Sequence, residues 1–309
     1  MSHKSRTALT IFIILFVAIA GVYWTIRSAK IPESIYPLTV RDDIGRTVEL
    51  GTEPERVVSL SPGNTEILFA LGLDDQIVGV SDYCDHPAQA KEKQKVGGFA
   101  TISIERVVSL EPDLVLATGG VQLRTVNRLE ELGIKTLVLS PKTVEDILND
   151  IELVGKITNK NSEAVILVEE LKNRIRFIES ATFQLKSTPR VYYEIWHSPL
   201  MSAGQDTWIN ELIDLAGGIN IFSDSSDPYP IISSELVIYR DPEIIIIKRG
   251  YMGGIAKEDI EVRPGWNRIT AVKMGRIYEI DEDILIRPGP RIIDGLEALA
   301  AIIHPQLFA

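Results

Sequence analysis

The apolar positions of this chain fall into short blocks that alternate between two periods. From residue 56 onward, buried-looking runs such as RVVSLS (56–61) and DLVLAT (113–118) alternate with stretches whose apolar residues fall on one helical face. This alternation predicts parallel strands joined by covering helices. The segment 37–50 comes before them, and the polar turn around Gly45 at its centre predicts a hairpin.

The first half therefore holds a regular series of expected elements. We predict strands at 56–61, 76–81, 113–118 and 135–140, and helices at 61–72, 103–110, 121–133 and 143–157. Two helix starts have local signals, because Ser103 and the Thr143–Asp146 pair, which resembles a capping box, offer side-chain oxygens to free first-turn amides. The second half begins the order again, with strands at 190–198, 243–248 and 275–281, and helices at 207–218, 233–239 and 290–304.

One sequence pattern, a glutamate-bearing helix followed by an apolar strand, occurs twice in the chain. ERVVSLEPDLVLATGG (105–120) and SELVIYRDPEIIIIKRG (234–250) match when Glu105 is placed on Glu235. Between them, residues 162–182 hold no glycine or proline and predict one helix of roughly 30 Å. The expected fold is α/β: two Rossmann-like lobes with mainly parallel sheets, joined by one long rigid helix. The lobes would span 36–160 and 184–309, with the connecting helix at 161–183.

The N-terminus predicts export. Residues 8–26 carry no charge, which is long enough for a membrane-spanning helix, and Lys4 and Arg6 keep the tail 1–7 cytoplasmic. We expect a retained anchor followed by a linker at 27–35, so that the lobes lie on the extracytoplasmic face of the membrane. The alternative is a cleaved signal sequence, which would make the protein periplasmic. No cysteine follows the apolar stretch, so a lipid-modified N-terminus is not expected.

Composition narrows the class further. The net charge of −11 argues against nucleic-acid binding, because phosphates demand a basic surface. The single cysteine, Cys84, excludes an intramolecular disulfide and a CxxC motif. A chain of 309 residues with 45% hydrophobic positions fits two globular domains.

Five segments, taken in order, resemble the substrate-binding proteins of ABC importers for iron-siderophores, haem and cobalamin. They are RVVSLSPGNTEILFALG, VGVSDYCDHP, ISIERVVSLEPDLVLA, WINELIDLAGGINIF and RPGPRIIDGLEALAAIIHP. The resemblance covers residues 36–309 and is strongest to the cobalamin-binding members. It implies the class III periplasmic-binding fold, little hinge motion, a ligand held between the lobes, and docking on an ABC permease dimer with its ATPase subunits. No cofactor of the protein's own is implied.

Aromatic side chains follow several of the predicted strands. They are Tyr83, Phe99, Trp196 with His197 beside it, Tyr229 and Tyr251. Because ligands bind beyond the carboxyl ends of strands in open α/β sheets, we expect these residues to line a cleft between the lobes. Large flat side chains suit a large, partly apolar ligand. The alternative is that some of them pack beneath their own loops.

Charge favours one ligand class. Ferric siderophores and haem carry catecholates or carboxylates and usually need a basic pocket, whereas the expected cleft holds mainly Arg287, with Arg249 a second candidate. A neutral corrinoid (cobalamin or cobinamide) fits better, and a ferric siderophore or haem is the alternative. The resemblance implies ligand contacts at Tyr83, Phe99, Tyr229 and Arg287. Thr118 stands where the cobalamin-binding members have a tryptophan.

The adjacent Cys84, Asp85 and His86 do not predict a metal site, because three neighbouring residues converge poorly on one ion. Cys84 is expected to be a small buried side chain. His197 could instead reach an axial position on cobalt or haem iron, although an ordinary polar contact is the simpler interpretation.

The resemblance also implies one glutamate on each lobe that meets arginines of the permease. Glu66 in NTEILFALG and Glu211 in NELIDLAGG match when the two lobes are aligned. Each stands one residue before an apolar pair, so we expect both carboxylates off the buried helix faces, on the lobe tops. Paired acidic contacts would orient the protein on a dimeric partner. The alternative is that both are solvated helix carboxylates.

An exported enzyme and a sensor domain are the rival classes. The sequence holds no G-x-G-x-x-G after its first strand, no P-loop and no G-x-S-x-G. The single predicted span leaves almost no cytoplasmic tail through which to signal. We therefore predict a binding protein and no enzymatic activity.

Overall fold

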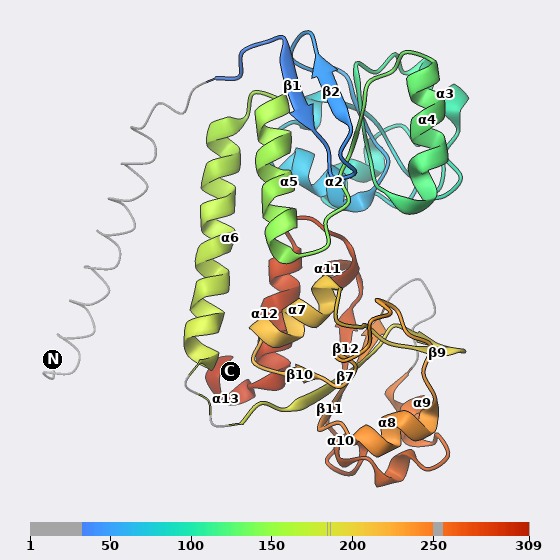
Figure 1. Cartoon of the computed structure of the whole chain (residues 1–309), viewed down its shortest axis with the longest axis vertical. Helices are drawn as coiled ribbons and strands as arrows, with labels where there is room; N and C mark the ends of the chain where they lie inside the picture. Colours follow the sequence, from blue (N-terminus) through green and yellow to red (C-terminus); the bar gives the residue numbers. More distant parts are fainter. Residues whose placement is uncertain (1–32, 184, 186, 250–255, 309) are drawn as a thin grey trace, which may run out of the picture.

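The computed structural model describes residues 33–183, 185, 187–249 and 256–308. Two α/β lobes lie one above the other, and long helices run along one side of both (Figure 1). The predicted tail and anchor at 1–26 and the candidate residue Tyr251 lie outside the described residues. Within the described ranges, no helix is long and apolar enough to cross a membrane.

The N-lobe is built from the predicted hairpin and a parallel sheet. Its strands are β1 (Leu38–Arg41), β2 (Thr47–Leu50), β3 (Val57–Ser59), β4 (Ile77–Val80), β5 (Leu114–Ala117) and β6 (Thr136–Val138). Its helices are α2 (Pro62–Ala70), α3 (Ile104–Ser109), α4 (Leu123–Glu131) and α5 (Val144–Ile157). Strands β1 and β2 pair antiparallel, and the others form a sheet in the order β4-β3-β5-β6. Both predicted helix starts are confirmed: Ser103 accepts from the Arg106 amide, and Thr143 and Asp146 form a capping box.

The C-lobe repeats the plan with a second parallel sheet in the order β10-β7-β11-β12. Its strands are β7 (Arg190–Glu194), β8 (Trp196–His197), β9 (Leu200–Met201), β10 (Ile219–Asn220), β11 (Ile244–Arg249) and β12 (Ile277–Asp281). Its helices are α7 (Trp208–Leu215), α8 (Ser234–Arg240), α9 (Lys257–Glu261), α10 (Thr270–Lys273), α11 (Asp283–Ile286), α12 (Ile292–Ile303) and α13 (Pro305–Phe308). The prediction of one strand over 190–198 is wrong in part, because the sheet strand ends at Glu194 and a separate β8–β9 hairpin follows.

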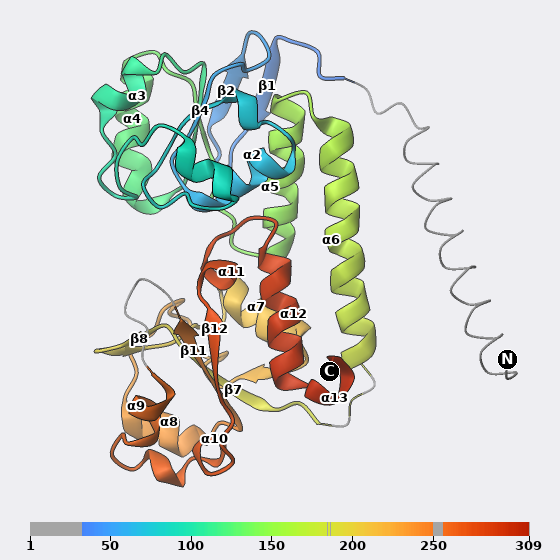
Figure 2. The ribbon, with the colours of Figure 1, turned by 180° about the vertical axis from the view of Figure 1, so that it is seen from behind.

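The long helix α6 (Asn161–Thr182) joins the lobes. It packs against α5 of the N-lobe and against α7 and α12 of the C-lobe, along the side of the molecule seen in Figure 2. One apolar core runs through all of these helices and reaches both sheets, for example at Leu116 of β5 and Ile246 of β11. A shared core resists separation of the lobes, because opening it would expose apolar surface to water. The predicted fold class of two parallel-sheet lobes with a helical connection is confirmed.

Candidate functional site

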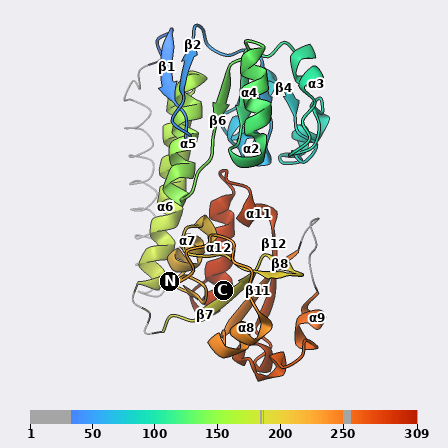
Figure 3. The same cartoon turned by 45° about the vertical axis from the view of Figure 1, so that its right-hand side comes forward.

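Loops at the carboxyl ends of the strands make the contacts between the lobes. The loop after β4 reaches the C-lobe at Asp85, which pairs with Arg287 in the loop that follows β12 and the short helix α11. The segment after β6 leads into α5, whose Val144 amide donates to Glu211 of α7. Figure 3 shows α2 of the N-lobe facing α11 and the start of α12. Ligands in open α/β sheets bind beyond these strand ends, so the seam between the lobes is the candidate site.

On the N-lobe side, two predicted aromatic residues stand exposed on neighbouring loops. Tyr83 is 46% exposed and Phe99 is 37% exposed. The buried Gln122 ties these loops together, because its amide donates to the carbonyls of Leu60 and Phe99 and accepts from the Thr118 amide. Sequence reasoning missed Gln122, since a lone glutamine after two glycines carries no pattern.

On the C-lobe side, the β8–β9 hairpin assembles three predicted residues. The rings of Trp196 and His197 stack with their centroids 5.4 Å apart. Met201 in β9 forms a bridge with Ile231, which brings the Tyr229 loop alongside the hairpin. Tyr229 is 41% exposed, and His197 is also exposed. Burial of its ring raises the pKa of Tyr229, so the phenol stays neutral.

Two largely buried ion pairs lie in the same lobe. The Lys248 ammonium stands 5.3 Å from the Trp196 ring centroid and 3.1 Å from the Glu282 carboxylate. Arg263 pairs with Glu194 through two hydrogen bonds of 2.6 and 2.7 Å. The only sequence signals were a lysine that ends an all-isoleucine run and a glutamate that ends a buried strand.

Arg287 is held by carboxylates from both lobes. Its guanidinium lies 2.5 Å from Asp85 of the N-lobe and 2.7 Å from Asp283 of α11, and its side chain is 12% exposed. Partial burial opposes the effect, but the hydrogen bond and charge of Arg287 hold the pKa of Asp85 below its usual range. Arg287 therefore lies at the predicted seam, already paired.

The expectation that Glu66 lies off the buried face of its helix is wrong. Glu66 is 4% exposed, and its carboxylate accepts two hydrogen bonds from Arg291, at 2.7 and 2.9 Å. Burial raises the pKa of Glu66, with Arg291 opposing. The cause is packing: residues 63–68 of α2 are all buried, because the C-lobe loop 287–291 covers the side of the helix that its own lobe leaves open.

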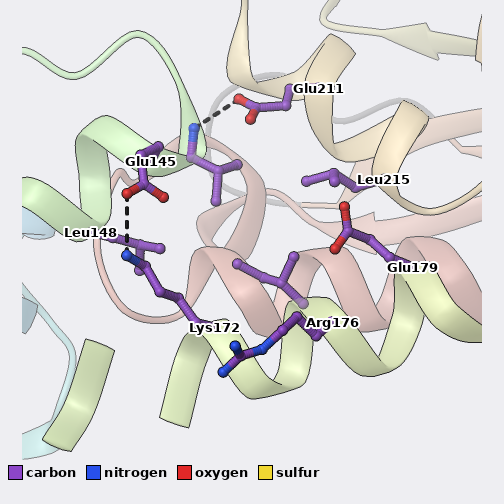
Figure 4. A pocket seen from close by; sticks show the side chains of 9 residues that line it. Glu145, Leu148, Lys172, Arg176, Glu179, Glu211 and Leu215 are labelled. Carbon is purple, nitrogen blue, oxygen red and sulfur yellow. Dashed lines mark hydrogen bonds and ion pairs between the residues drawn. The ribbon is translucent and has the colours of Figure 1, made fainter. Parts of the chain in front are cut away.

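Glu211 is half-buried for the matching reason. Its carboxylate accepts the Val144 amide at 2.7 Å, at the N-terminus of α5 in the other lobe, where the helix dipole favours negative charge. It lines a hollow of about 380 Å³ between α5, α6 and α7, together with charged residues such as Lys172 and Arg176 (Figure 4). Glu66 lines a second hollow of about 410 Å³ with Arg291. The two matched glutamates thus reach the starts of α12 and α5 from opposite lobes.

A different pair of matched glutamates is exposed. Glu105 in α3 and Glu235 in α8 both follow N-cap serines, Ser103 and Ser233. Both glutamates are exposed to solvent. Hydrogen bonds from its own backbone and from Ser103 lower the pKa of Glu105, so this carboxylate is ionised at neutral pH. The repeated unit therefore places one solvent-exposed acidic group on each lobe.

The Cys84-Asp85-His86 run does not converge on a common point. Cys84 is buried as expected, with its sulfur 3.1 Å from the hydroxyls of Thr65 and Ser81. Asp85 points instead to Arg287 in the other lobe.

Comparison with known proteins gives consistent matches. The family model described as periplasmic binding protein matches residues 57–284. An ABC transporter substrate-binding lipoprotein of Bacillus subtilis, YvrC, is 31% identical over 91% of this chain and 90% of its own length. The periplasmic vitamin B12-binding protein BtuF of Vibrio cholerae superposes with a TM-score of 0.70 at 30% identity, over 82% of this chain and 97% of that one. A periplasmic haem-binding protein of Pseudomonas aeruginosa superposes with a TM-score of 0.73 at 26% identity, over 82% and 94%.

Proposed function

The chain belongs to the periplasmic binding protein family and is the substrate-binding protein of an ABC importer, and we propose that its cargo is a corrinoid. The observation that carries this proposal is a set of aromatic rings on both lobes, three of them exposed and Trp196 partly exposed. Tyr83 and Phe99 stand on one side, and Trp196 and Tyr229 on the other. Aromatic rings on loops that are held by hydrogen bonds can cover a large ligand with little loss of conformational entropy on binding. Relatives named as vitamin B12-binding proteins, about 30% identical, support the same choice.

The second candidate cargo is haem or a ferric siderophore. The haem-binding protein of Pseudomonas aeruginosa has the same fold and similar structural agreement. The exposed imidazole of His197, stacked on Trp196, offers a nitrogen ligand that ferric haem accepts. This candidate requires the cargo's anionic groups to compete for Arg287, Arg291 or Lys248, which are already paired with carboxylates.

Identification of the copurifying ligand separates the two candidates. The full chain, extracted in detergent from cells supplied with both corrinoid and haem, is analysed by absorbance and mass spectrometry. We expect corrinoid bands and one corrinoid per chain, with binding of cyanocobalamin or cobinamide confirmed by calorimetry. A haem Soret band, or heat only with a ferric siderophore, would transfer the assignment to the second candidate.

We also assign permease docking to Glu105 and Glu235 in place of Glu66 and Glu211. An acidic group that meets arginines of a partner has to be accessible, and Glu66 is occupied by Arg291 inside the molecule. Glu105 and Glu235 are exposed at matching positions on the two lobes. Such paired charges steer and orient a two-lobed protein on a dimeric permease.

The proposed location is the extracytoplasmic face of the cell membrane, with residues 8–26 as the anchor. The Bacillus relative is named a lipoprotein, whereas the single cysteine of this sequence is Cys84, which is buried in the N-lobe. Intact mass of the protein from the membrane fraction tests the anchor. A mass that lacks the first twenty or so residues would instead establish a cleaved signal sequence.

A further inference from the structure

We propose that Asp85 selects the cargo by its charge. Asp85 pairs with Arg287, so that the site between the lobes accepts neutral chelates and rejects anionic ones. This inference rests on the proposed function and deepens it from an aromatic site to a charge-selective one. Asp85 comes two residues after Tyr83, and its pairing with Arg287 crosses from one lobe to the other.

The geometry leaves Arg287 little capacity for a ligand. One terminal nitrogen lies 2.5 Å from Asp85 and the other lies 2.7 Å from Asp283. Glu66 adds a third carboxylate at 3.8 Å. A guanidinium recognises a carboxylate or phosphate through two parallel N–H donors, and here each terminal nitrogen already faces an acidic partner. Asp283 comes from the same lobe as Arg287, so Asp85 is the partner that the N-lobe contributes.

Two neighbouring cations, Arg291 and Lys248, are paired as well. Arg291 is bound by Glu66 at 2.7 Å, and Lys248 lies 3.1 Å from Glu282 behind the Trp196 ring. Around the loop 287–291, two guanidinium groups thus face three carboxylates. Arg249, at the end of β11, is exposed and borders residues outside the described part of the chain.

The consequence for selectivity is electrostatic. An anionic cargo would have to displace Asp85 from Arg287 and would then face the repulsion of the remaining carboxylates. A neutral corrinoid pays neither cost, because it binds through ring contacts and amides. Rejection of a competitor by a placed like charge is a common source of specificity. Arg287 therefore links the two lobes, and Asp85 prevents it from binding an anionic cargo.

The test compares the full chain with its Asp85→Asn variant. Asparagine keeps the size and one hydrogen-bond acceptor but removes the charge. Calorimetry measures the affinity for cyanocobalamin (neutral), haemin (two carboxylates) and a ferric tricatecholate (triply charged). We expect the ratio of the affinity for anionic ligands to the affinity for the neutral ligand to rise about tenfold. This is a difference in binding free energy of about 1.4 kcal/mol at 25 °C. Glu49→Gln, at an exposed position of β2, is the control with the same change of net charge.

A second variant shows whether the gain runs through Arg287. The double variant Asp85→Asn with Arg287→Gln should lose the gain for both anionic ligands, and thermal unfolding checks that each variant folds. An unchanged ratio in Asp85→Asn, an equal fall for all three ligands, or a gain that survives loss of Arg287 would each overturn the proposal. If the parent chain binds no corrinoid while Asp85→Asn still gains affinity for haemin, the corrinoid assignment fails and the role of Asp85 stands.

Discussion

The carboxylate of Glu66 and the guanidinium of Arg291, 225 positions apart in the chain, form a two-point ion pair between the lobes. Nitrogen–oxygen distances of 2.7 and 2.9 Å join α2 of the N-lobe to the start of α12 in the C-lobe. Glu211 makes the reciprocal contact from the C-lobe to the start of α5. The two matched glutamates therefore help to fix the lobes against each other.

Glu66→Ala should lower the free energy of unfolding by about 3 kcal/mol, because it leaves the Arg291 guanidinium in a mostly buried place without its partner. Replacing both Glu66 and Arg291 by methionine should cost less than Glu66→Ala, since no uncompensated charge remains. Denaturant unfolding measures Glu66→Ala and the double methionine variant. Full stability in Glu66→Ala would show that the pair contributes nothing to the lobe interface.

Gly63→Ala should separate the lobes locally. A Cβ at this position would overlap the carbonyl oxygen of Pro288, where the C-lobe loop lies directly on the start of α2. Because backbone cannot move aside as a flexible side chain does, we expect a loss of about 2 kcal/mol in stability and weaker cargo binding. Gly51→Ala is the matched control, with no atom within 4 Å of the new carbon. Equal behaviour of the two variants would contradict the close packing of the seam.

Trp196→Ala and Tyr229→Ala should each weaken cargo binding and leave the fold intact. Truncation of an aromatic anchor in a desolvated site typically costs on the order of 2 kcal/mol, or about thirtyfold in affinity. Calorimetry with the identified cargo measures the loss, and Tyr239→Ala, at an exposed position of α8, is a control of similar size. If both variants keep the parent affinity, these rings pack only against their own loops.

Glu105→Ala combined with Glu235→Ala should nearly abolish uptake while cargo affinity stays unchanged. Desolvated interface pairs lose 2–5 kcal/mol, on typical estimates, when one partner is truncated, and two such pairs are removed. Glu→Arg at either position should be worse through like-charge repulsion, and binding to the purified permease should weaken as salt rises. Glu66→Ala and Glu211→Ala are the comparison, expected to act on stability. If the Glu105/Glu235 double variant takes up cargo at the parent rate, these two residues do not dock the permease.

Asp150 should make stability depend on pH. Its carboxyl in α5 is 3% exposed, and burial together with the charge of Asp43 raises its pKa to about 9. The folded state therefore holds a proton that the unfolded chain releases near pH 4, so stability falls as pH rises from about 4 to about 9. Asp150→Asn should remove this slope, which amounts to about 1.4 kcal/mol per pH unit, and so raise stability at pH 8 by up to about 5 kcal/mol. Unfolding curves at pH 5 and pH 8 measure it, and parallel slopes in both proteins would contradict the assignment.

The sequence by itself determined the local elements and the doubled plan. The hairpin around Gly45, the cap at Ser103 and the capping box at Thr143 depend on hydrogen bonds within a few residues, so their signals lie within a few residues. The alternation of strands and helices, together with the length of α6, was enough for two parallel-sheet lobes.

Only the tertiary structure decided which charged residues are free. The apolar periodicity of a helix predicts only the face that packs against its own lobe. The other side of α2 is covered by a C-lobe loop that comes more than 200 residues later in the chain. The sequence therefore predicts surface or ligand-binding roles for Glu66, Glu211 and Arg287. In the structure each of them has a partner in the other lobe. Burial and pairing at a lobe interface depend on how two folded surfaces meet, and that contact leaves no short-range pattern in either one.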